Sequence, residues 1–259
     1  MTHREGSSPL DELDVFTAMM ARRPVRVTYA LIGLYIVLFA LCELWGGSES
    51  TATLIAMGAE VPVLIKQGEW WRLLAATALH GGLIHILLNS YVLYSFGPFL
   101  EKLLGWQRFV VLYIVAGLAG TLLGTAVGEL VGIQVSIGAS GSLFGLLGAA
   151  AVLAFREMGL PHELMASLRK AALVNLGLNV VASLRPHVDW VAHLGGGLSG
   201  AVLMLILIRP KLSDETRTPT ERSFTVLAVL CVVALLVSVL VGMLNGKPWL
   251  PIAPESSTL

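Results

Sequence analysis

Four polar side chains able to take part in nucleophilic chemistry lie within apolar stretches of this sequence. Ser140 belongs to IGASGSLFGLLGAA, His85 and Asn89 to HGGLIHILLN, and His193 to DWVAHLGGGLSG. Polar side chains in hydrocarbon are costly, so such positions are candidates for function. A serine hydroxyl becomes a useful nucleophile only when a base removes its proton, and His193 is the natural base. The residue types therefore predict attack by Ser140 on a carbonyl carbon.

An attack of this kind creates an oxyanion, which needs hydrogen-bond donors. Ser140 is expected in the first turn of a helix, where backbone N–H groups lack partners and the helix dipole favours negative charge. His85 and Asn89 are four residues apart, hence on one helical face, and can add side-chain donors. Asp189 stands four residues before His193, but we expect it to face the aqueous end of its helix. The sequence therefore favours a Ser–His dyad without an acidic third member.

Other hydrolytic chemistries lack their residue patterns in this sequence. No H-E-x-x-H occurs, and the five-residue spacing of His80 and His85 does not suit zinc on one helix face. No pair of intramembrane aspartates is present. Position 142 is Ser in GASGS, so the G-x-S-x-G turn of α/β-hydrolases is not formed. The sequence thus predicts neither a metal nor a cofactor.

The composition predicts the kind of scaffold that must position these residues. The chain has 259 residues, of which 56% are hydrophobic and 13% charged, and a mean hydropathy of +0.79. Soluble domains usually carry about 25% charged residues. We therefore expect an all-α polytopic membrane protein in contact with the lipid bilayer. The net charge is zero, which gives no indication of a nucleic-acid partner.

Seven stretches are candidates for a membrane span, which needs about 20 mostly apolar residues. They cover residues 28–45, 82–100, 109–129, 138–155, 171–185, 189–208 and 223–244. The fifth stretch is short and carries Asn175 and Asn179, so we expect it to be tilted or to lie near water. The long loop 46–81 contains Trp70 and Trp71, which suit the bilayer interface.

Charge asymmetry predicts the orientation. With the N-terminus in the cytoplasm and seven spans, 13 of the 17 Lys and Arg residues fall on the cytoplasmic side. The C-terminus then lies on the outer side, and we expect the protein in the cell membrane. The even-numbered spans enter from the outer face, so His85, Ser140 and His193 lie at similar depths in the outer leaflet.

Small residues on the fourth and sixth predicted spans indicate that these two helices approach closely. Gly141 and Gly145 form one small-xxx-small pair, and Gly196 and Gly200 form another. Helices without β-carbons at their crossing can bring their backbones together. We therefore expect Ser140 and His193 to come within hydrogen-bond reach although they are 53 residues apart.

The sequence divides into four segments. Residues 1–27 form a cytoplasmic N-terminal tail, 28–208 a six-helix catalytic membrane core, 209–222 a polar cytoplasmic linker, and 223–259 a seventh span with a short outer tail. The linker RPKLSDETRTPTER sets the seventh span apart from the first six.

Taken together, the motifs resemble those of the rhomboid family of intramembrane serine proteases. The resemblance covers about residues 28–208 and rests on four elements in order along the chain. They are W-R at Trp71–Arg72, H-x-x-x-x-H-x-x-x-N at His80, His85 and Asn89, G-x-S-G at 138–141, and A-H-x-x-G-x-x-x-G at 192–200. The seventh span resembles the six-plus-one arrangement of some family members.

The resemblance implies a role for each matched position. It implies a Ser140–His193 dyad, and an oxyanion hole made by the Ser140 N–H, His85 and Asn89. Many members have a Tyr four residues after the serine that stacks on the histidine. Phe144 holds that position here, so the stacking is kept and a hydroxyl is lost. The supporting positions are Gly138, Gly141, Phe144, Gly196, Gly200, Trp71, Arg72 and His80.

Two functions from different classes follow. The first is an intramembrane serine endopeptidase that cleaves single-span membrane proteins in or near their transmembrane helices. In the family, the loop that carries Trp71–Arg72 packs as a partly embedded flap, and substrate helices are thought to enter past the second and fifth spans. The alternative is a non-proteolytic membrane protein that binds or escorts client helices. A transporter is less well supported, because the polar set lies in the outer leaflet and discontinuous helices are lacking.

Overall fold

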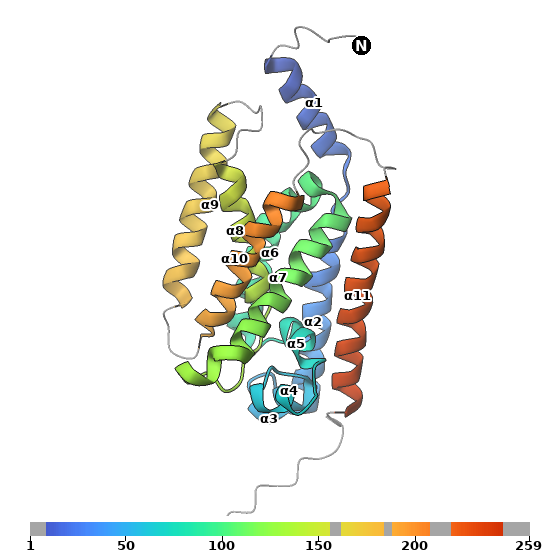
Figure 1. The fold of residues 1–259 in the computed structure, drawn as a ribbon, viewed down its shortest axis with the longest axis vertical. Coiled ribbons are helices and arrows are strands. Elements are labelled where there is room, and N and C mark those ends of the chain that lie inside the picture. Colours follow the sequence, from blue (N-terminus) through green and yellow to red (C-terminus); the bar gives the residue numbers. More distant parts are fainter. Residues whose placement is uncertain (1–8, 156–161, 184–187, 208–218, 246–259) are drawn as a thin grey trace, which may run out of the picture.

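The computed structural model is a bundle of helices, and it describes residues 9–155, 162–183, 188–207 and 219–245 (Figure 1). The α-helices are α1 Pro9–Arg22, α2 Val27–Trp45, α3 Thr51–Met57, α4 Pro62–Lys66, α5 Arg72–Ala75, α6 Leu83–Leu104, α7 Trp106–Val127, α8 Ser140–Ala154, α9 His162–Ser183, α10 Trp190–Leu207 and α11 Pro219–Asn245. Short 3-10 turns lie at Ala76–Ala78 and Gly128–Val131. Within these described ranges, β-pairing is limited to an isolated bridge between Glu60 and Ser136.

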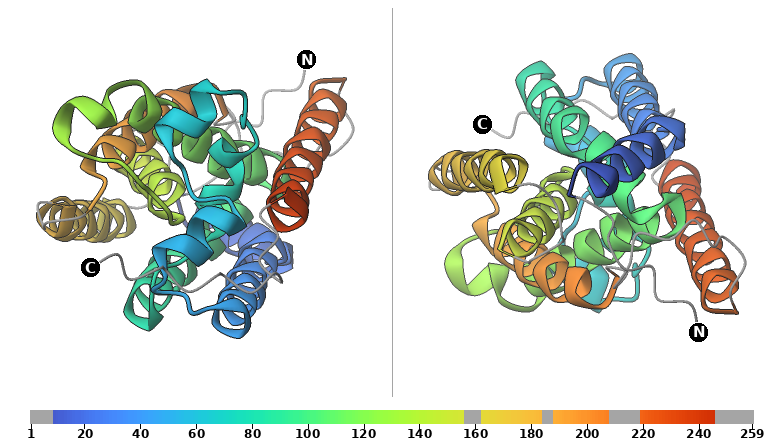
Figure 2. Two further views of the ribbon diagram at one scale, coloured as in Figure 1. Left: turned by 90° about the horizontal axis from the view of Figure 1, so that it is seen from below. Right: turned by 90° about the horizontal axis from the view of Figure 1, so that it is seen from above.

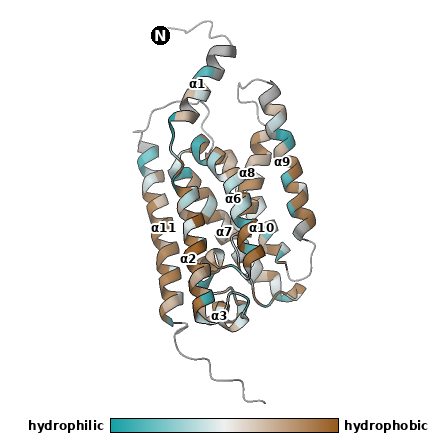
Figure 3. Cartoon of the chain, turned by 180° about the vertical axis from the view of Figure 1, so that it is seen from behind, coloured by the Kyte–Doolittle hydropathy of each residue, from teal (hydrophilic) through white to brown (hydrophobic). Residues whose placement is uncertain are grey.

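Among the described residues, five stretches of helix are long and apolar enough to cross a membrane. They are Phe16–Trp45, Leu83–Leu104, Trp106–Val131, Trp190–Leu207 and Glu221–Asn245. Helix α8 is apolar but has 15 residues, and α9 has 22 residues with a lower hydrophobicity. Hydrophobic residues predominate along the long helices (Figure 3), and many of their large apolar side chains are exposed, which water would disfavour and lipid would not. The prediction of an all-α polytopic membrane protein is confirmed.

Helices α9 and α11 begin earlier in the structure than the spans predicted at 171 and 223. Helix α9 begins at His162, nine residues before the predicted start at 171, because the intervening segment HELMASLRK is polar but rich in good helix formers. Its predicted end at 185 lies outside the described residues. Helix α11 begins at Pro219, and proline is favoured in the first turn of a helix. The tail residues 1–8 and 246–259 and linker residues 209–218 also lie outside the described ranges.

Helix α7 forms the centre of the bundle, with α8 and α10 packed on one side and α11 on another (Figure 2). Its Phe109, Leu112 and Ala116 are fully buried. The Tyr113 hydroxyl on α7 is hydrogen-bonded to the Tyr35 hydroxyl on α2. This central helix is the common support for the elements that carry the site.

Helices α8 and α10 cross at their glycines. A β-carbon added to Gly196 would overlap the carbonyl of Gly141, and one added to Gly200 would overlap the backbone of Gly145. The structure therefore brings the two small-xxx-small pairs together. Ser140 is one residue before Gly141 in the sequence, and His193 is three residues before Gly196. Both site residues thus stand close to the point where the helices cross.

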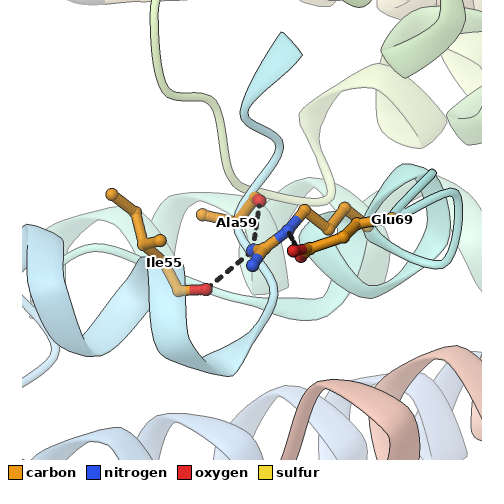
Figure 4. A network of polar contacts seen from close by, with 4 residues as sticks. Ile55, Ala59 and Glu69 are labelled. Carbon is orange, nitrogen blue, oxygen red and sulfur yellow. Dashed lines mark hydrogen bonds and ion pairs between the residues drawn. The ribbon is translucent and has the colours of Figure 1, made fainter. Parts of the chain in front are cut away.

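The loop between α2 and α6 is held together by polar contacts of Arg72 with Ile55, Ala59 and Glu69, the three residues labelled in Figure 4. Arg72 Nη1 donates to the carbonyl oxygens of Ile55 at 2.7 Å and Ala59 at 3.0 Å, and its Nε pairs with Glu69 at 2.6 Å. The same guanidinium lies over the Trp71 ring, 4.5 Å from its centre. Because Arg72 is buried, these contacts hold three short helices of the loop in one arrangement.

Candidate active site

A cavity of about 1170 Å³ lies between α6, α8, α9, the start of α10 and the loop before α8. Ser140, His193, His85 and Asn89, which come from three different helices, all border it. Phe144, Asn175, Asn179 and Asp189 line it as well. The structure therefore gathers the four polar residues singled out by the sequence around one space.

Gly138 allows Ser140 and His85 to border the same part of this cavity. Its φ of +118° lies in the left-handed region, which favours glycine. A β-carbon on Gly138 would stand 2.7 Å from His85 Nε2 and 3.8 Å from Ser140 Oγ. The backbone N–H of Gly138 is bonded to the carbonyl of Ala76 at 2.9 Å, which fixes the turn that leads into α8.

The hydrogen bond on one side of the His85 ring determines which nitrogen carries its proton. The backbone N–H of Gly81 donates to His85 Nδ1 at 3.3 Å. Since Nδ1 accepts this bond, a neutral His85 carries its hydrogen on Nε2. Nε2 is the atom that faces Gly138, so the His85 ring presents a hydrogen-bond donor to the space beside Ser140.

Two further residues of the histidine–asparagine motif stand around His85. His80 is buried behind it, with ring centres 5.2 Å apart, and its other neighbour is the Tyr35 ring at 4.7 Å. His80 lies in the loop before α6, where burial first, and the nearby His85 second, lower its pKa to about 3. Asn89 is buried on the next turn of α6, and one of its amide N–H groups donates to the His85 carbonyl at 2.9 Å. Its second amide N–H is left for the cavity.

Two contacts hold the His193 ring, one on its face and one at its edge. Its ring stacks on Phe144 with 4.2 Å between ring centres and 13° between planes. Its Nδ1 is hydrogen-bonded to the Ser183 hydroxyl at 2.6 Å. Across the described parts of the chain, the hydrogen bond of the His193 ring goes to Ser183 and not to Ser140. Sequence reasoning missed Ser183, because nothing in the local pattern VASLRP distinguishes it from a packing serine.

The remaining predicted site residues lie outside the cavity wall. Trp71 and Arg72 belong to the folded loop, and Trp71 packs against α11, where a β-carbon on Gly242 would stand 2.8 Å from its ring. Gly196 and Gly200 lie at the crossing of α8 and α10.

Asp189 was expected at the aqueous end of its helix. In the structure it lines the cavity, and its Oδ1 accepts a 2.8 Å bond from the N–H of Ala192 in the first turn of α10.

Among the described residues, three or more His, Cys, Asp or Glu side chains do not come together in a group that could hold a metal ion. The two histidines at the cavity are held by hydrogen bonds to Gly81 and Ser183 through their Nδ1 atoms.

This fold and site define a class: a multi-pass helical membrane protein with a serine and two histidines around a cavity between its spans. Residues 67–210 match the Rhomboid domain, which is more than half of the chain. The chain belongs to the rhomboid family.

Several family members are similar to this chain over much of its length. Rhomboid protease GluP of Bacillus subtilis is 37% identical over 186 residues, which cover 71% of this chain and 35% of GluP. RHOMBOID-like protein 5 of Arabidopsis thaliana is 37% identical over 163 residues, or 62% of this chain and 52% of that protein. The rhomboid protein YdcA of Bacillus subtilis is 34% identical over 151 residues, or 57% and 72%. The chain thus matches about a third of GluP and about half of RHOMBOID-like protein 5.

Proposed function

We propose that this protein is an intramembrane serine endopeptidase in which Ser140 is the nucleophile and His193 the general base. The observation that carries the proposal is the meeting of Ser140, His193, His85 and Asn89 at one cavity inside a membrane bundle. Membership of a family that includes proteins named as proteases supports it further.

The proposed reaction uses these residues in sequence. His193 takes the hydroxyl proton of Ser140 while the oxygen attacks the substrate carbonyl carbon. The resulting oxyanion accepts hydrogen bonds from the Ser140 N–H, from His85 Nε2 and from the free amide N–H of Asn89. His193 then returns the proton to the leaving amine, which breaks the peptide bond and leaves an acyl group on Ser140. Water, activated by the same histidine, releases the second product.

The composition of the cavity wall supports a membrane-embedded substrate. Besides the polar set, the cavity is lined by Ile84, Leu88 and Tyr91 of α6 and by Leu178 of α9. These four side chains are more than half exposed on the outside of the bundle. The cavity therefore reaches the lipid-facing surface beside α6 and α9, and a single-span helix can approach from the bilayer. We place the site in the outer leaflet of the cell membrane, with the N-terminus in the cytoplasm and the C-terminus outside, because of the distribution of basic residues.

The proposal is tested with the full chain in liposomes and a single-span membrane protein as substrate. Ser140→Ala and His193→Ala should each abolish cleavage, and a fluorophosphonate probe should label the wild-type protein but not Ser140→Ala. Cleavage by Ser140→Ala at the wild-type rate would refute the assignment. Binding of the substrate helix by the wild-type protein, with neither cleavage nor probe labelling, would favour the alternative function of a non-proteolytic helix escort.

A further inference from the structure

Ser183 stands at the edge of the proposed catalytic base. It is the last residue of α9, it is buried, and its hydroxyl oxygen lies 2.6 Å from His193 Nδ1. The same oxygen lies 2.7 Å from the backbone carbonyl of Asn179, one turn earlier on α9. The hydroxyl therefore has two polar neighbours, and the direction of each hydrogen bond follows from counting hydrogens.

A serine hydroxyl has one hydrogen and two lone pairs. A carbonyl oxygen can only accept, so the bond to Asn179 uses that hydrogen. At 2.6 Å from the imidazole, the Ser183 oxygen must then accept, and His193 Nδ1 must donate. The opposite direction would leave two oxygens facing each other at 2.7 Å without a hydrogen between them.

We infer that Ser183 is a positioning residue that fixes the tautomer of His193 with its proton on Nδ1. This inference rests on the proposed function. The tautomer leaves the lone pair of the neutral ring on Nε2, which is the form a general base needs to accept the proton of Ser140. The role is the one an aspartate fills in a Ser–His–Asp triad, but a neutral hydroxyl fills it here.

The bond also remains in place after proton transfer. The imidazolium carries hydrogens on both nitrogens, so Nδ1 continues to donate to Ser183 while Nε2 holds the proton from Ser140. With Phe144 stacked on the face of the ring and Ser183 at its edge, both the tilt and the rotation of His193 are fixed. No rearrangement of the base is needed between the two steps.

The two histidines of the site receive opposite assignments from the same reasoning. His85 accepts at Nδ1 from Gly81 and so offers a hydrogen at Nε2, whereas His193 donates at Nδ1 and so offers a lone pair at Nε2. One ring is thereby prepared as an oxyanion donor and the other as a base. An exchange of the two tautomers would disable both.

The contact also makes His193 sensitive to the position of α9. This helix lies at the edge of the bundle and packs mainly on α8 (Figure 2). In its first half Arg169 donates to the Ala154 carbonyl at 3.2 Å, and at its last residue Ser183 contacts His193. An outward shift of the last turn of α9 would break the bond to Nδ1, so the base is complete only when α9 is docked.

The test compares two variants that have nearly the same shape. Ser183→Val and Ser183→Thr both add a branched β-carbon, but only Thr keeps the hydroxyl. We expect Ser183→Val to lower kcat about ten-fold, the size of one neutral hydrogen bond, with less than about a two-fold change in KM. Ser183→Thr should recover most of the rate. Ser95→Ala, which removes a hydroxyl bonded to the Tyr91 carbonyl on the exposed side of α6, should leave kcat unchanged.

A spectroscopic measurement distinguishes a positioning role of Ser183 from a purely structural contribution to the fold. In nitrogen-15 histidine spectra of the full chain in detergent, assigned with His193→Gln, the wild-type protein should show a protonated Nδ1 and an unprotonated Nε2 for His193. In Ser183→Val the two tautomers should mix, with the fold intact by thermal unfolding. If Ser183→Val and Ser183→Ala keep both the wild-type kcat and the wild-type tautomer while Ser140→Ala is inactive, this inference fails and the proposed function stands. If Ser140→Ala is active, the proposed function fails, and the tautomer measurement still decides whether Ser183 orients the ring.

Discussion

The carboxyl groups of Glu60 and Asp189 lie together beside Gly124, although Glu60 belongs to the segment between α3 and α4 and Asp189 directly precedes α10. A β-carbon on Gly124 would stand 2.8 Å from Glu60 Oε1 and 3.2 Å from Asp189 Oδ2. Glu60 is 2% exposed and accepts a 3.0 Å bond from the Thr125 hydroxyl. Within the described residues, Glu60 Oε2 and Asp189 Oδ2 are buried without a hydrogen-bond partner. Two carboxyl groups this close, one of them on a fully buried residue, are best accommodated when Glu60 holds a proton.

This pair predicts a pH dependence of stability. Burial first, and the charge of Asp189 second, raise the pKa of Glu60 from 4.5 to about 8. Because the folded protein keeps this proton to a higher pH than the unfolded chain, the free energy of unfolding should fall as the pH rises from about 4.5 to about 8. Glu60→Gln removes the titrating group, so it should flatten this slope and stabilise the protein at pH 8 by more than about 1 kcal/mol.

Unfolding in detergent, followed at several pH values, measures the effect of Glu60. Glu129→Gln is the matched control, because Glu129 pairs with Lys66 at the surface, where its side chain is 38% exposed. That substitution should change stability by less than about 1 kcal/mol at every pH. A pH slope in Glu60→Gln as steep as in the wild-type protein would contradict the prediction.

The close crossing of α8 and α10 predicts that alanine substitutions at two nearby glycines of α10 have different effects on stability. Gly200→Ala forces a methyl group into the backbone of Gly145, which should destabilise the protein by about 1–3 kcal/mol. Gly197→Ala places its methyl group 3.7 Å from the Phe144 carbonyl, an ordinary contact, and adds helix propensity. It should leave stability unchanged or slightly raised. Equal midpoints of thermal unfolding for the two variants would show that the crossing is looser than the structure indicates.

Some of these features could be predicted from the sequence and others could not. The crossing of α8 and α10 was predictable, because the missing β-carbons that allow it are written as glycines at four-residue spacing. The start of α9 was not, because the polar segment before residue 171 ends the apolar pattern without ending the helix. Hydropathy reports which residues suit lipid, whereas the helix boundary depends on backbone propensity.

The candidate site likewise contains residues that the sequence indicates and partners that it does not. Ser140, His85, Asn89 and His193 are conspicuous because each is a polar residue in an apolar stretch. The partners that act on them are not conspicuous: Ser183 reaches His193 only because the last residue of α9 lies beside α10, and the Gly81 N–H reaches His85 from the loop before α6. Such contacts depend on three-dimensional positions that no local pattern encodes.

The turn before Ser140 predicts a loss of activity when its glycine is replaced. Gly138→Ala adds a methyl group 2.7 Å from His85 Nε2 and strains a residue with φ of +118°. We expect kcat to fall about 100-fold, the effect of displacing one oxyanion donor, and fluorophosphonate labelling of Ser140 to slow in parallel. Gly33→Ala, where the new methyl group meets open space on α2, serves as the control and should keep full activity. A Gly138→Ala protein with the wild-type kcat would argue against an oxyanion site at this place.

Replacing Glu101, which lies far from the cavity, should strongly lower the stability of the protein. Its carboxylate accepts 2.8 Å bonds from the backbone N–H groups of Arg26, Val27 and Thr28, and from the Thr28 hydroxyl. It thereby completes the first turn of α2 from a position on α6, where negative charge also suits the helix dipole. Glu101→Ala should destabilise the protein by about 3 kcal/mol or more. Glu101→Gln, which keeps an acceptor but loses the charge, should cost less, and the order of the two in thermal unfolding checks the assignment.

The attachment of α11 to the rest of the bundle predicts a non-additive pair of substitutions. Arg108 on α7 and Glu221 on α11 form a buried ion pair at 2.6 Å, and the Arg108 guanidinium lies 4.6 Å from the centre of the Phe224 ring. Removing one charge, as in Glu221→Met or Arg108→Met, leaves the other charge buried and should cost about 3–5 kcal/mol. The double variant Arg108→Met/Glu221→Met replaces both with apolar side chains and should return close to the wild-type stability. A double-mutant cycle by unfolding in detergent measures the coupling, and a double variant whose loss equals the sum of the two single losses would mean that the ion pair does not join α11 to α7.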